Sequence, residues 1–194
     1  MVGEKSADYG GAMPGGMDLN NWVVLFTRTG SEEKLARLLS GNLKSGEYLP
    51  FVPTKEKPYR SKGVIEKIRK PLFPGYLFVQ TEISPKLIAE SLGQYLKDHK
   101  DIYKLLHYGE DAKDVTLREI ERLHLERLFN DNFCIDGSMG FIEGDKIIIT
   151  SGALVGLESQ IKRINRHKRE AIIEIEMLGA LRDITVMLEV VMKV

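Results

Sequence analysis

A short proline-bounded run, Pro71 to Val79, constrains the fold of this chain more than any other stretch. Pro71 and Pro74 are three residues apart, and a helix cannot form there because proline lacks a backbone N–H and clashes with the preceding turn. Gly75 then frees the backbone to bend into an apolar, aromatic segment that favours a β-strand. This elbow predicts that aromatic side chains are held in fixed directions.

Three aromatic side chains, Phe73, Tyr76 and Phe78, follow one another through the elbow. Aromatic residues in strands are usually packing residues, so at least one of the three is expected to face the core. The rigidity of the elbow favours the presentation of the others, and we expect one or two of the three to face solvent.

The segment directly before the elbow, residues 55–70, carries seven basic residues against two acidic ones. Ser61-Lys62-Gly63 at its middle predicts a hairpin turn. Two interpretations stay open: a solvated hairpin whose lysines discourage edge pairing, and an arm that binds RNA phosphates while Tyr59 stacks on an unpaired base. The RNA-binding candidates of this segment are Lys55, Lys57, Tyr59, Arg60, Lys62, Lys67, Arg69 and Lys70.

Strand and helix patterns alternate through the first two thirds of the chain. The apolar run Trp22–Thr27 predicts a buried strand, and leucines at helical spacing after Glu32 predict a helix. Tyr48–Pro53 predicts an edge strand, because its two prolines cannot donate to a central ladder. Ser84-Pro85 has the pattern of a second helix start. This order predicts an α+β layer, a sheet covered by helices on one face.

The last third begins with a helix pattern and ends in strand patterns. Thr116 and Glu119 have capping-box spacing at the start of a helix that ends near Phe129. Its expected apolar side consists of Leu117, Ile120, Leu123 and Leu128. Residues 130–140 are polar and contain two glycines, which predicts a linker that is either loose or laid on the surface.

From residue 141 onward, four short apolar runs separated by glycines predict a small, strongly bent β-barrel. A basic cluster lies at a turn between two of these runs. It fits equally a solvated turn and a contact to RNA or protein. The RNA-binding candidates of this cluster are Lys162, Arg163, Arg166, His167, Lys168 and Arg169.

Composition excludes several classes of protein. A net charge of zero argues against a strongly basic protein that coats nucleic acid, and the single cysteine, Cys134, rules out an intramolecular disulfide. Neither a secretory signal nor an apolar stretch long enough for a bilayer is found, so a cytoplasmic protein is expected. Residues 1–20 are glycine-rich at their start and predict an added or disordered leader. The four histidines are scattered, and we expect no catalytic residues, metal or cofactor.

These motifs, in this order, resemble the NusG family of transcription elongation factors. The Pro71–Val79 run together with Trp22–Phe26 is similar to the family's N-terminal NGN domain. Gly144–Ile149 followed by Gly152–Glu158 is similar to its C-terminal KOW module, an SH3-like β-barrel. The resemblance implies an NGN-like domain at 21–129, a linker at 130–140 and a KOW domain at 141–194. A barrel is expected rather than the helical hairpin that this module can form in the paralogue RfaH, because the strand runs are β-branched and alternating.

The resemblance implies that the first domain binds RNA polymerase, on the clamp helices of its largest subunit. The implied polymerase-binding residues are Trp22, Phe51, Phe73, Pro74, Gly75, Tyr76 and Phe78. The KOW module would bind a second protein. Ser159 replaces a glycine of the KOW pattern, and Ala180, Leu181 and Arg182 replace a glycine–arginine pair and a proline, so the family's usual KOW partners are not carried over.

The basic segment 55–70 and the run Phe51–Lys57 resemble more closely the LoaP-type specialised paralogues. Those are processive antiterminators of selected operons, associated with an RNA hairpin in the nascent leader. The expected function is therefore a monomeric antitermination and elongation regulator that binds polymerase and leader RNA and promotes read-through of terminators. The alternatives are a housekeeping NusG elongation factor and, from a different class, a KOW-containing ribosomal RNA-binding protein. An enzyme is disfavoured.

Overall fold

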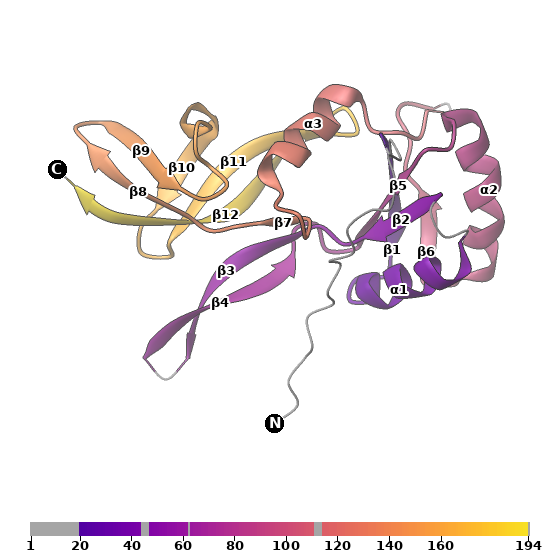
Figure 1. Ribbon diagram of the computed structural model, residues 1–194, viewed down its shortest axis with the longest axis horizontal. Coiled ribbons are helices and arrows are strands. Elements are labelled where there is room, and N and C mark those ends of the chain that lie inside the picture. Colours follow the sequence, from indigo (N-terminus) through magenta and orange to yellow (C-terminus); the bar gives the residue numbers. More distant parts are fainter. Residues whose placement is uncertain (1–19, 44–46, 62, 111–113, 194) are drawn as a thin grey trace.

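The computed structural model describes residues 20–43, 47–61, 63–110 and 114–193. Of the expected leader, only residue 20 lies among them, and Lys62 lies outside. Figure 1 shows a helix-covered sheet at one end of an elongated molecule and a second, purely β module at the other end, with a long hairpin beneath the second module.

The first sheet is four-stranded and antiparallel, in the order β2-β5-β1-β6. Its strands are β1 (Asn21–Thr27), β2 (Tyr48–Phe51), β5 (Tyr76–Thr81) and β6 (Ile102–Leu105). The expectation that the proline-containing segment around β2 forms an edge is confirmed.

Two helices, α1 (Glu32–Asn42) and α2 (Pro85–Asp98), cover one face of this sheet. Alternate residues of the strands point to that face, where Val23, Leu25 and Leu77 are fully buried against the helices. The other residues of the same strands, such as Trp22 and Phe78, belong to a separate core on the opposite face. The predicted α+β layer is confirmed.

The basic segment forms the hairpin of β3 (Thr54–Ser61) and β4 (Val64–Pro71), paired along its whole length from Thr54↔Pro71 to Ser61↔Val64. A short strand, β7 (Cys134–Ile135), adds to the base of β3 in parallel. Residues 130–140, expected to connect the two domains, thus contain β7 and the first residues of β8, and Cys134 and Ile135 are buried.

The C-terminal module is a five-stranded sheet in the order β10-β11-β12-β8-β9. Its elements are β8 (Ser138–Glu143), β9 (Lys146–Ser151), the 3₁₀ turn η1 (Glu158–Gln160), β10 (Ile161–Asn165), β11 (Glu170–Met177) and β12 (Ala180–Lys193). The long strand β12 pairs antiparallel with β11 through Met187 and then parallel with β8 from Leu188 onward.

The expected closed barrel is not found. Among the described residues β9 and β10 are end strands with no pairing between them, and a cleft of about 300 Å³ lies at this opening, lined by side chains that include Ile147 and Ile161. The four expected apolar runs are all strands, and the additional strand β8 lies partly in the segment that was expected to be a linker.

A third helix, α3 (Glu119–Leu128), lies over the junction between the two modules. It ends where the sequence predicts, and its expected apolar side is confirmed at Leu117 and Leu128 but wrong at Ile120 and Leu123. Ile120 and Leu123 are exposed, whereas Leu125 and Leu128 are buried together with the polar residue Glu121. The helix is therefore rotated so that a carboxylate, and not a leucine stripe alone, faces the interior.

Candidate functional site

The elbow is fixed by one buried carboxylate at the start of α1. Glu32 accepts hydrogen bonds from the N–H of Gly75 at 2.6 Å and from the N–H of Gly30 at 2.7 Å. Gly75 has φ +85°, and an added Cβ would approach Thr29 Oγ1 to 3.1 Å, so only glycine fits without strain. The proline elbow and the first helix are thereby joined into one rigid unit.

The aromatic residues of the elbow lie in a buried cluster. Phe78 and Phe73 are 0% and 8% exposed, and their ring centroids are 6.0 Å apart. Trp22 and Phe51 complete the cluster, with centroids 5.2 Å apart. Tyr76 is half-buried, Pro74 is exposed and Gly75 is buried.

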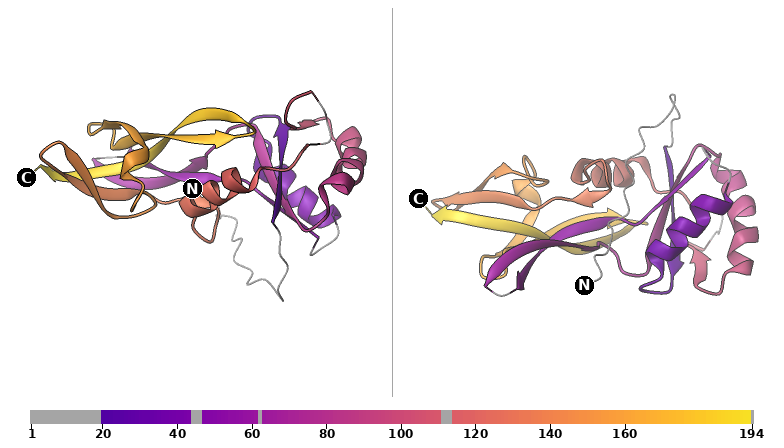
Figure 2. Two further views of the ribbon diagram at one scale, coloured as in Figure 1. Left: turned by 90° about the horizontal axis from the view of Figure 1, so that it is seen from above. Right: turned by 60° about the horizontal axis from the view of Figure 1, so that its bottom comes forward.

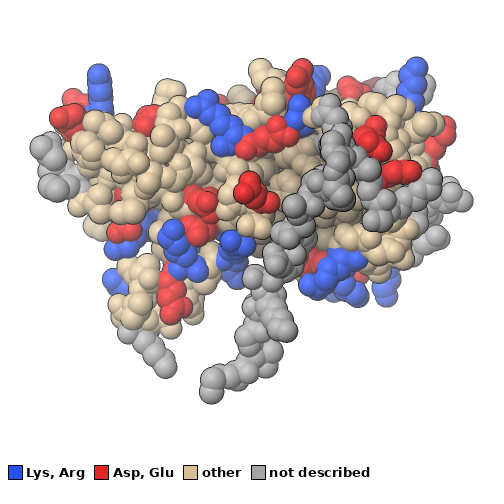
Figure 3. Space-filling view, viewed as in Figure 1, with Lys and Arg blue, Asp and Glu red and all other residues tan. Residues whose placement is uncertain are grey.

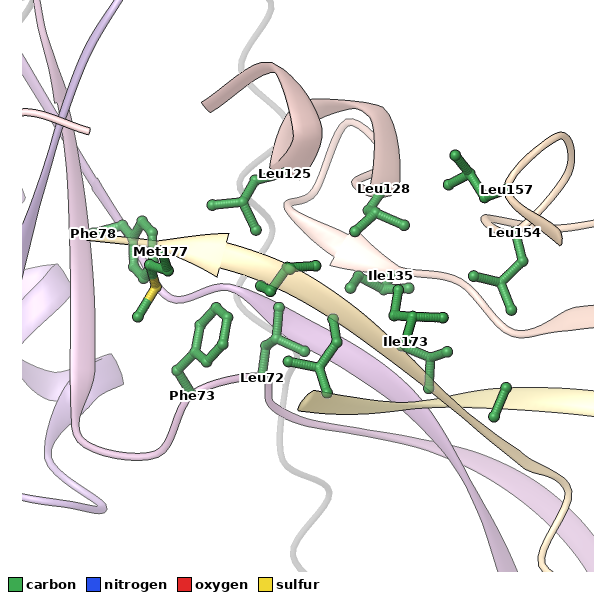
Figure 4. Close-up of a cluster of buried hydrophobic side chains, with 14 of the residues drawn as sticks. Leu72, Phe73, Phe78, Leu125, Leu128, Ile135, Leu154, Leu157, Ile173 and Met177 are labelled. Carbon is green, nitrogen blue, oxygen red and sulfur yellow. The ribbon is translucent and has the colours of Figure 1, made fainter. Parts of the chain in front are cut away.

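The expectation that at least one of the three aromatic residues faces the core is confirmed by Phe73 and Phe78, and Tyr76 alone of the three is partly exposed. The reason is a cover that comes from distant parts of the chain. Figure 4 shows Leu125 of α3 and Met177 of β11 next to Phe78 and Phe73, in the same buried cluster. This cover makes one hydrophobic core that spans both modules.

Two further aromatic residues seal the cluster from the segment after α3. Phe129 stacks on Trp22 with an interplanar angle of 12°, and Phe133 stacks on Phe51 at a centroid distance of 3.9 Å. Offset aromatic pairs of this kind are favourable beyond the area that they bury. In the sequence these two phenylalanines only flank a short polar stretch, and that pattern does not indicate their contacts with Trp22 and Phe51.

A polar clasp holds the cover at its far end. Glu121 of α3 is 1% exposed, and its carboxylate accepts hydrogen bonds from the Tyr108 hydroxyl, from Arg118 N–H at 3.1 Å and from Gly179 N–H at 2.8 Å. Burial, together with the hydrogen bond to this carboxylate, raises the pKa of Tyr108. Gly179 lies in the β11–β12 turn, so Glu121 connects the first module, α3 and the C-terminal sheet.

The base of the hairpin is bound to the C-terminal sheet. Lys55 donates to the carbonyl of Thr185 at 2.6 Å, and Glu56 accepts from Gly137 N–H at 2.7 Å. Burial and the neighbouring charge of Lys57 lower the pKa of Lys55. Burial alone would raise the pKa of Glu56, but hydrogen bonds from Lys67 and Gly137 outweigh it and lower that pKa.

The hairpin also runs alongside the C-terminal sheet (Figure 2). Residues of both basic clusters line one cleft between them. This cleft has a volume of about 330 Å³ and is lined by residues that include Lys57 and Lys168. Lys57 lies 3.9 Å from Glu170 in an ion pair. The structure thus brings together two segments that the sequence only suggests separately.

Some of the candidate RNA-binding residues form ion pairs within the protein, and others are exposed without an ion pair among the described residues. Lys67 pairs with Glu56, Lys162 with Glu174 and Asp183, and Arg169 with Glu189. Tyr59 is 51% exposed. Within the described ranges, the exposed candidates without an ion pair are Arg60, Arg69, Lys70, Arg163, Arg166, His167 and Lys168. Figure 3 shows basic and acidic side chains interspersed on one face of the molecule, in agreement with the zero net charge.

The part of the chain that the structure describes holds no group of three or more histidine, cysteine, aspartate or glutamate residues placed to bind a metal ion. Cys134 is buried, and burial raises the pKa of its thiol. Among the described helices, none has the length and apolar character needed to cross a membrane.

An antiparallel sheet with helices on one face and an aromatic elbow, joined to a small β module, defines a two-module α+β protein. A family model described as "Transcription termination factor nusG" matches residues 20–124, more than half of the chain. The chain therefore belongs to the NusG family, a family of transcription factors.

The chain is also similar to a named relative and to a solved structure. The chain is 23% identical over 165 residues to the "Transcription termination/antitermination protein NusG" of Thermus thermophilus, covering 81% of this chain and 90% of the relative. It is also similar to a chain of the "MjSpt4:Spt5 complex conformation B" at 15% identity, covering 86% of this chain and 98% of the other, with a TM-score of 0.28.

Proposed function

We propose that this protein is a transcription antitermination and elongation regulator that binds RNA polymerase through the aromatic face of its first sheet. The observation that carries the proposal is the family match over residues 20–124, which includes Trp22, Phe51 and the whole elbow. The similarity to the termination and antitermination protein of Thermus thermophilus supports the same role. The domain boundaries proposed with it are an NGN-like domain at 21–129, a linker at 130–140 and a KOW domain at 141–194.

The polymerase surface proposed here is covered in the described arrangement. Phe73 and Phe78 lie beneath α3 and β11, in a core shared with residues such as Met177. Binding of a polymerase helix to these aromatic side chains therefore requires that the C-terminal module move off the sheet. The clasp at Glu121 and the contacts of Lys55 and Glu56 are the polar interactions that such a movement breaks.

We propose that RNA is bound by the exposed cations along the hairpin and the β10–β11 turn. The net charge of the chain is zero, unlike that of proteins that coat nucleic acid, so a defined RNA element, such as a leader hairpin, is favoured over coating of any RNA. Each exposed arginine or lysine that neutralises a phosphate adds a salt-sensitive contribution to affinity. This is the specialised, LoaP-type form of the function.

The polymerase proposal is tested by capture of purified RNA polymerase on the immobilised full-length chain. Met177→Lys places a charge against Phe78 in the shared core and is expected to detach the cover, which increases capture severalfold. Adding Tyr76→Ala to this variant should reduce capture again. Leu87→Ala, on the exposed side of α2, is the matched surface control.

Absence of capture by both the wild type and the Met177→Lys variant would overturn the polymerase proposal. The specialised role is separated from housekeeping elongation by in vitro read-through of a terminator with and without a leader hairpin upstream. Read-through that is independent of the hairpin would favour the housekeeping function.

A further inference from the structure

The cleft between the basic hairpin and the C-terminal sheet has the size of a small-molecule site. It lies where β3 runs alongside the C-terminal sheet in Figure 2, and its lining comes from β3, from the end of the β10–β11 turn with the start of β11, and from β12. Its volume of about 330 Å³ is at the lower end of the range of ligand pockets, roughly 300–1,000 Å³. A ligand as small as one nucleotide is therefore expected to fill it.

Two lysines with spare donor capacity line this cleft from opposite sides. Lys57 belongs to β3, and Lys168 belongs to the β10–β11 turn. Lys168 is exposed and forms no ion pair within the ranges that the structure describes. The Nζ of Lys57 is 3.9 Å from the nearest carboxylate oxygen of Glu170, which is too long for a hydrogen bond. Two such ammonium groups favour an anion with several acceptor oxygens, and phosphate is the common ligand of this kind.

The rest of the lining includes an apolar part. Pro58 of β3 borders the cleft together with Val186 and Met187 of β12, which are 1% and 5% exposed. The flat face of a nucleobase packs well against apolar side chains, whereas inorganic phosphate gains nothing from them. The combination of lysines and apolar surface therefore favours a nucleotide over a simple anion.

The two carboxylates of the lining differ in what occupies them. Glu56 accepts hydrogen bonds from Lys67 at 2.8 Å and from Gly137 N–H at 2.7 Å. Glu170 has only the distant ion pair with Lys57, so its carboxylate keeps acceptor capacity for N–H groups of a ligand. Among the RNA bases, guanine presents two adjacent N–H groups, N1 and N2, that one carboxylate can accept together.

We propose that this cleft binds one guanine nucleotide, with its phosphate between Lys57 and Lys168 and the edge of its base on Glu170. Two sources supply this chemistry, a free guanine nucleotide and an unpaired guanosine of an RNA. In either case the ligand bridges the hairpin and the C-terminal sheet.

The bridge has a regulatory consequence, which alone rests on the proposed function. Uncovering the aromatic face moves the C-terminal module off the first module, and this movement separates the two walls of the cleft. A ligand that binds only the joined arrangement stabilises it. A guanine nucleotide in the cleft therefore opposes uncovering of the polymerase surface.

The phosphate contact is tested by isothermal titration calorimetry of the full-length chain with guanosine monophosphate (GMP). Lys168→Gln is expected to weaken binding about tenfold, the effect of losing one charge-assisted hydrogen bond. Guanosine, which lacks the phosphate, should bind at least as weakly to the wild type. Lys86→Gln removes an exposed lysine of α2 outside the cleft and is the matched control. Thermal melts confirm that each variant is folded.

The base contact is tested by the ratio of the affinities for GMP and for adenosine monophosphate. The wild type should prefer GMP about tenfold, and Glu170→Gln should remove the preference because an amide cannot accept both N–H groups. A merely structural role of Glu170 would lower both affinities and leave their ratio unchanged. GMP binding that Lys168→Gln does not weaken would overturn the proposal, as would an unchanged ratio in Glu170→Gln.

An RNA stem–loop with one unpaired guanosine, compared with the same stem–loop carrying uridine there, distinguishes the sources. A preference for guanosine that Glu170→Gln abolishes identifies RNA as the source, and equal binding of both stem–loops beside GMP binding identifies the free nucleotide. Binding of neither GMP nor the guanosine stem–loop would overturn the proposal.

The bridge is tested by hydrogen exchange of β3 and of residues 185–187, which saturating GMP should slow in the wild type and not in Lys168→Gln. Unchanged exchange in the wild type would overturn the bridge. Polymerase capture is measured separately, so its failure would refute the proposed function and leave the nucleotide site standing.

Discussion

The two faces of the first sheet are built from the same strands but covered in different ways. Leu25 and Leu77 face helices α1 and α2, which are close neighbours in sequence, and the contacts are aliphatic. Trp22 and Phe78 face α3 and β11, which lie roughly 40 to 150 residues further along the chain. The first cover is an integral part of the module, whereas the second comes from distant segments and is held by a shared hydrophobic core together with a few polar contacts. We infer that the helical face determines stability and that the aromatic face is the one that can be uncovered.

The sharpest test of this comparison introduces a charge on the aromatic side. Met177→Lys should expose β11 and α3 to hydrogen exchange while the amides of β1 and β5 stay protected, because an unpaired buried charge costs several kcal/mol and detachment relieves it. Hydrogen exchange followed by mass spectrometry measures both regions at once. Simultaneous loss of protection in β1 would show that the two faces are not separable.

On the helical face, Leu25→Ala should lower the free energy of unfolding by about 2–5 kcal/mol, since the side chain is fully buried and the helices cannot close the cavity completely. Urea unfolding of the full chain measures the effect. A loss below about 1 kcal/mol would contradict the assignment of stability to this face.

A substitution in the clasp, the hydrogen bonds of Glu121, is expected to weaken the cover by an intermediate amount. Glu121→Gln keeps the size of the side chain but replaces a carboxylate oxygen with an amide group that cannot accept from Gly179 and Tyr108 in the same way. The cover should weaken by about 1–3 kcal/mol, the cost of a disturbed buried hydrogen-bond group. Hydrogen exchange of residues 177–181 reports it, and Glu119→Gln, an exposed carboxylate at the start of the same helix, is the control. Unchanged exchange would remove Glu121 from the contacts that hold the cover.

The smallest effect is a dependence on pH at the base of the hairpin. The pKa of Glu56 is lower in the folded state than its ordinary value, so the carboxylate contributes stability above that value and loses it as the pH falls through the folded pKa. The contribution should stay below about 1 kcal/mol because Lys67 is largely exposed. Unfolding of wild type and Glu56→Gln at pH 6 and pH 3 measures it. A difference that grows on acidification would contradict this sign.

Local patterns in the sequence were sufficient to predict most of the strands and helices. The apolar run Trp22–Thr27 identifies the buried strand β1, the prolines around β2 identify an edge, and the turn at Ser61–Gly63 identifies the hairpin. In each case the deciding interaction lies within a few residues or follows from the chemistry of one side chain. The resemblance of these motifs to the NusG family is confirmed by the family match over residues 20–124.

What the sequence could not supply depends on contacts between distant segments. The aromatic pattern of the elbow does not reveal whether solvent, a partner or β11 covers Phe78. The rotation of α3 follows from the bond between Glu121 and Gly179, 58 residues apart. The strand β7 forms in a polar stretch because it pairs with β3, about 80 residues earlier. Closure of the C-terminal barrel likewise depends on β9 and β10 meeting, which they do not.

The hairpin has a mechanical consequence that follows from its dimensions. Each strand has eight residues, so the arm extends roughly 25 Å from its base at 3.3 Å per residue. The base is joined to β7 and to β12, at the joint between the modules. A load on the tip therefore acts as torque about that joint, with the leverage of the whole arm. A weak attachment at the tip is sufficient to bias the angle between the modules, which makes the hairpin a lever as well as a surface.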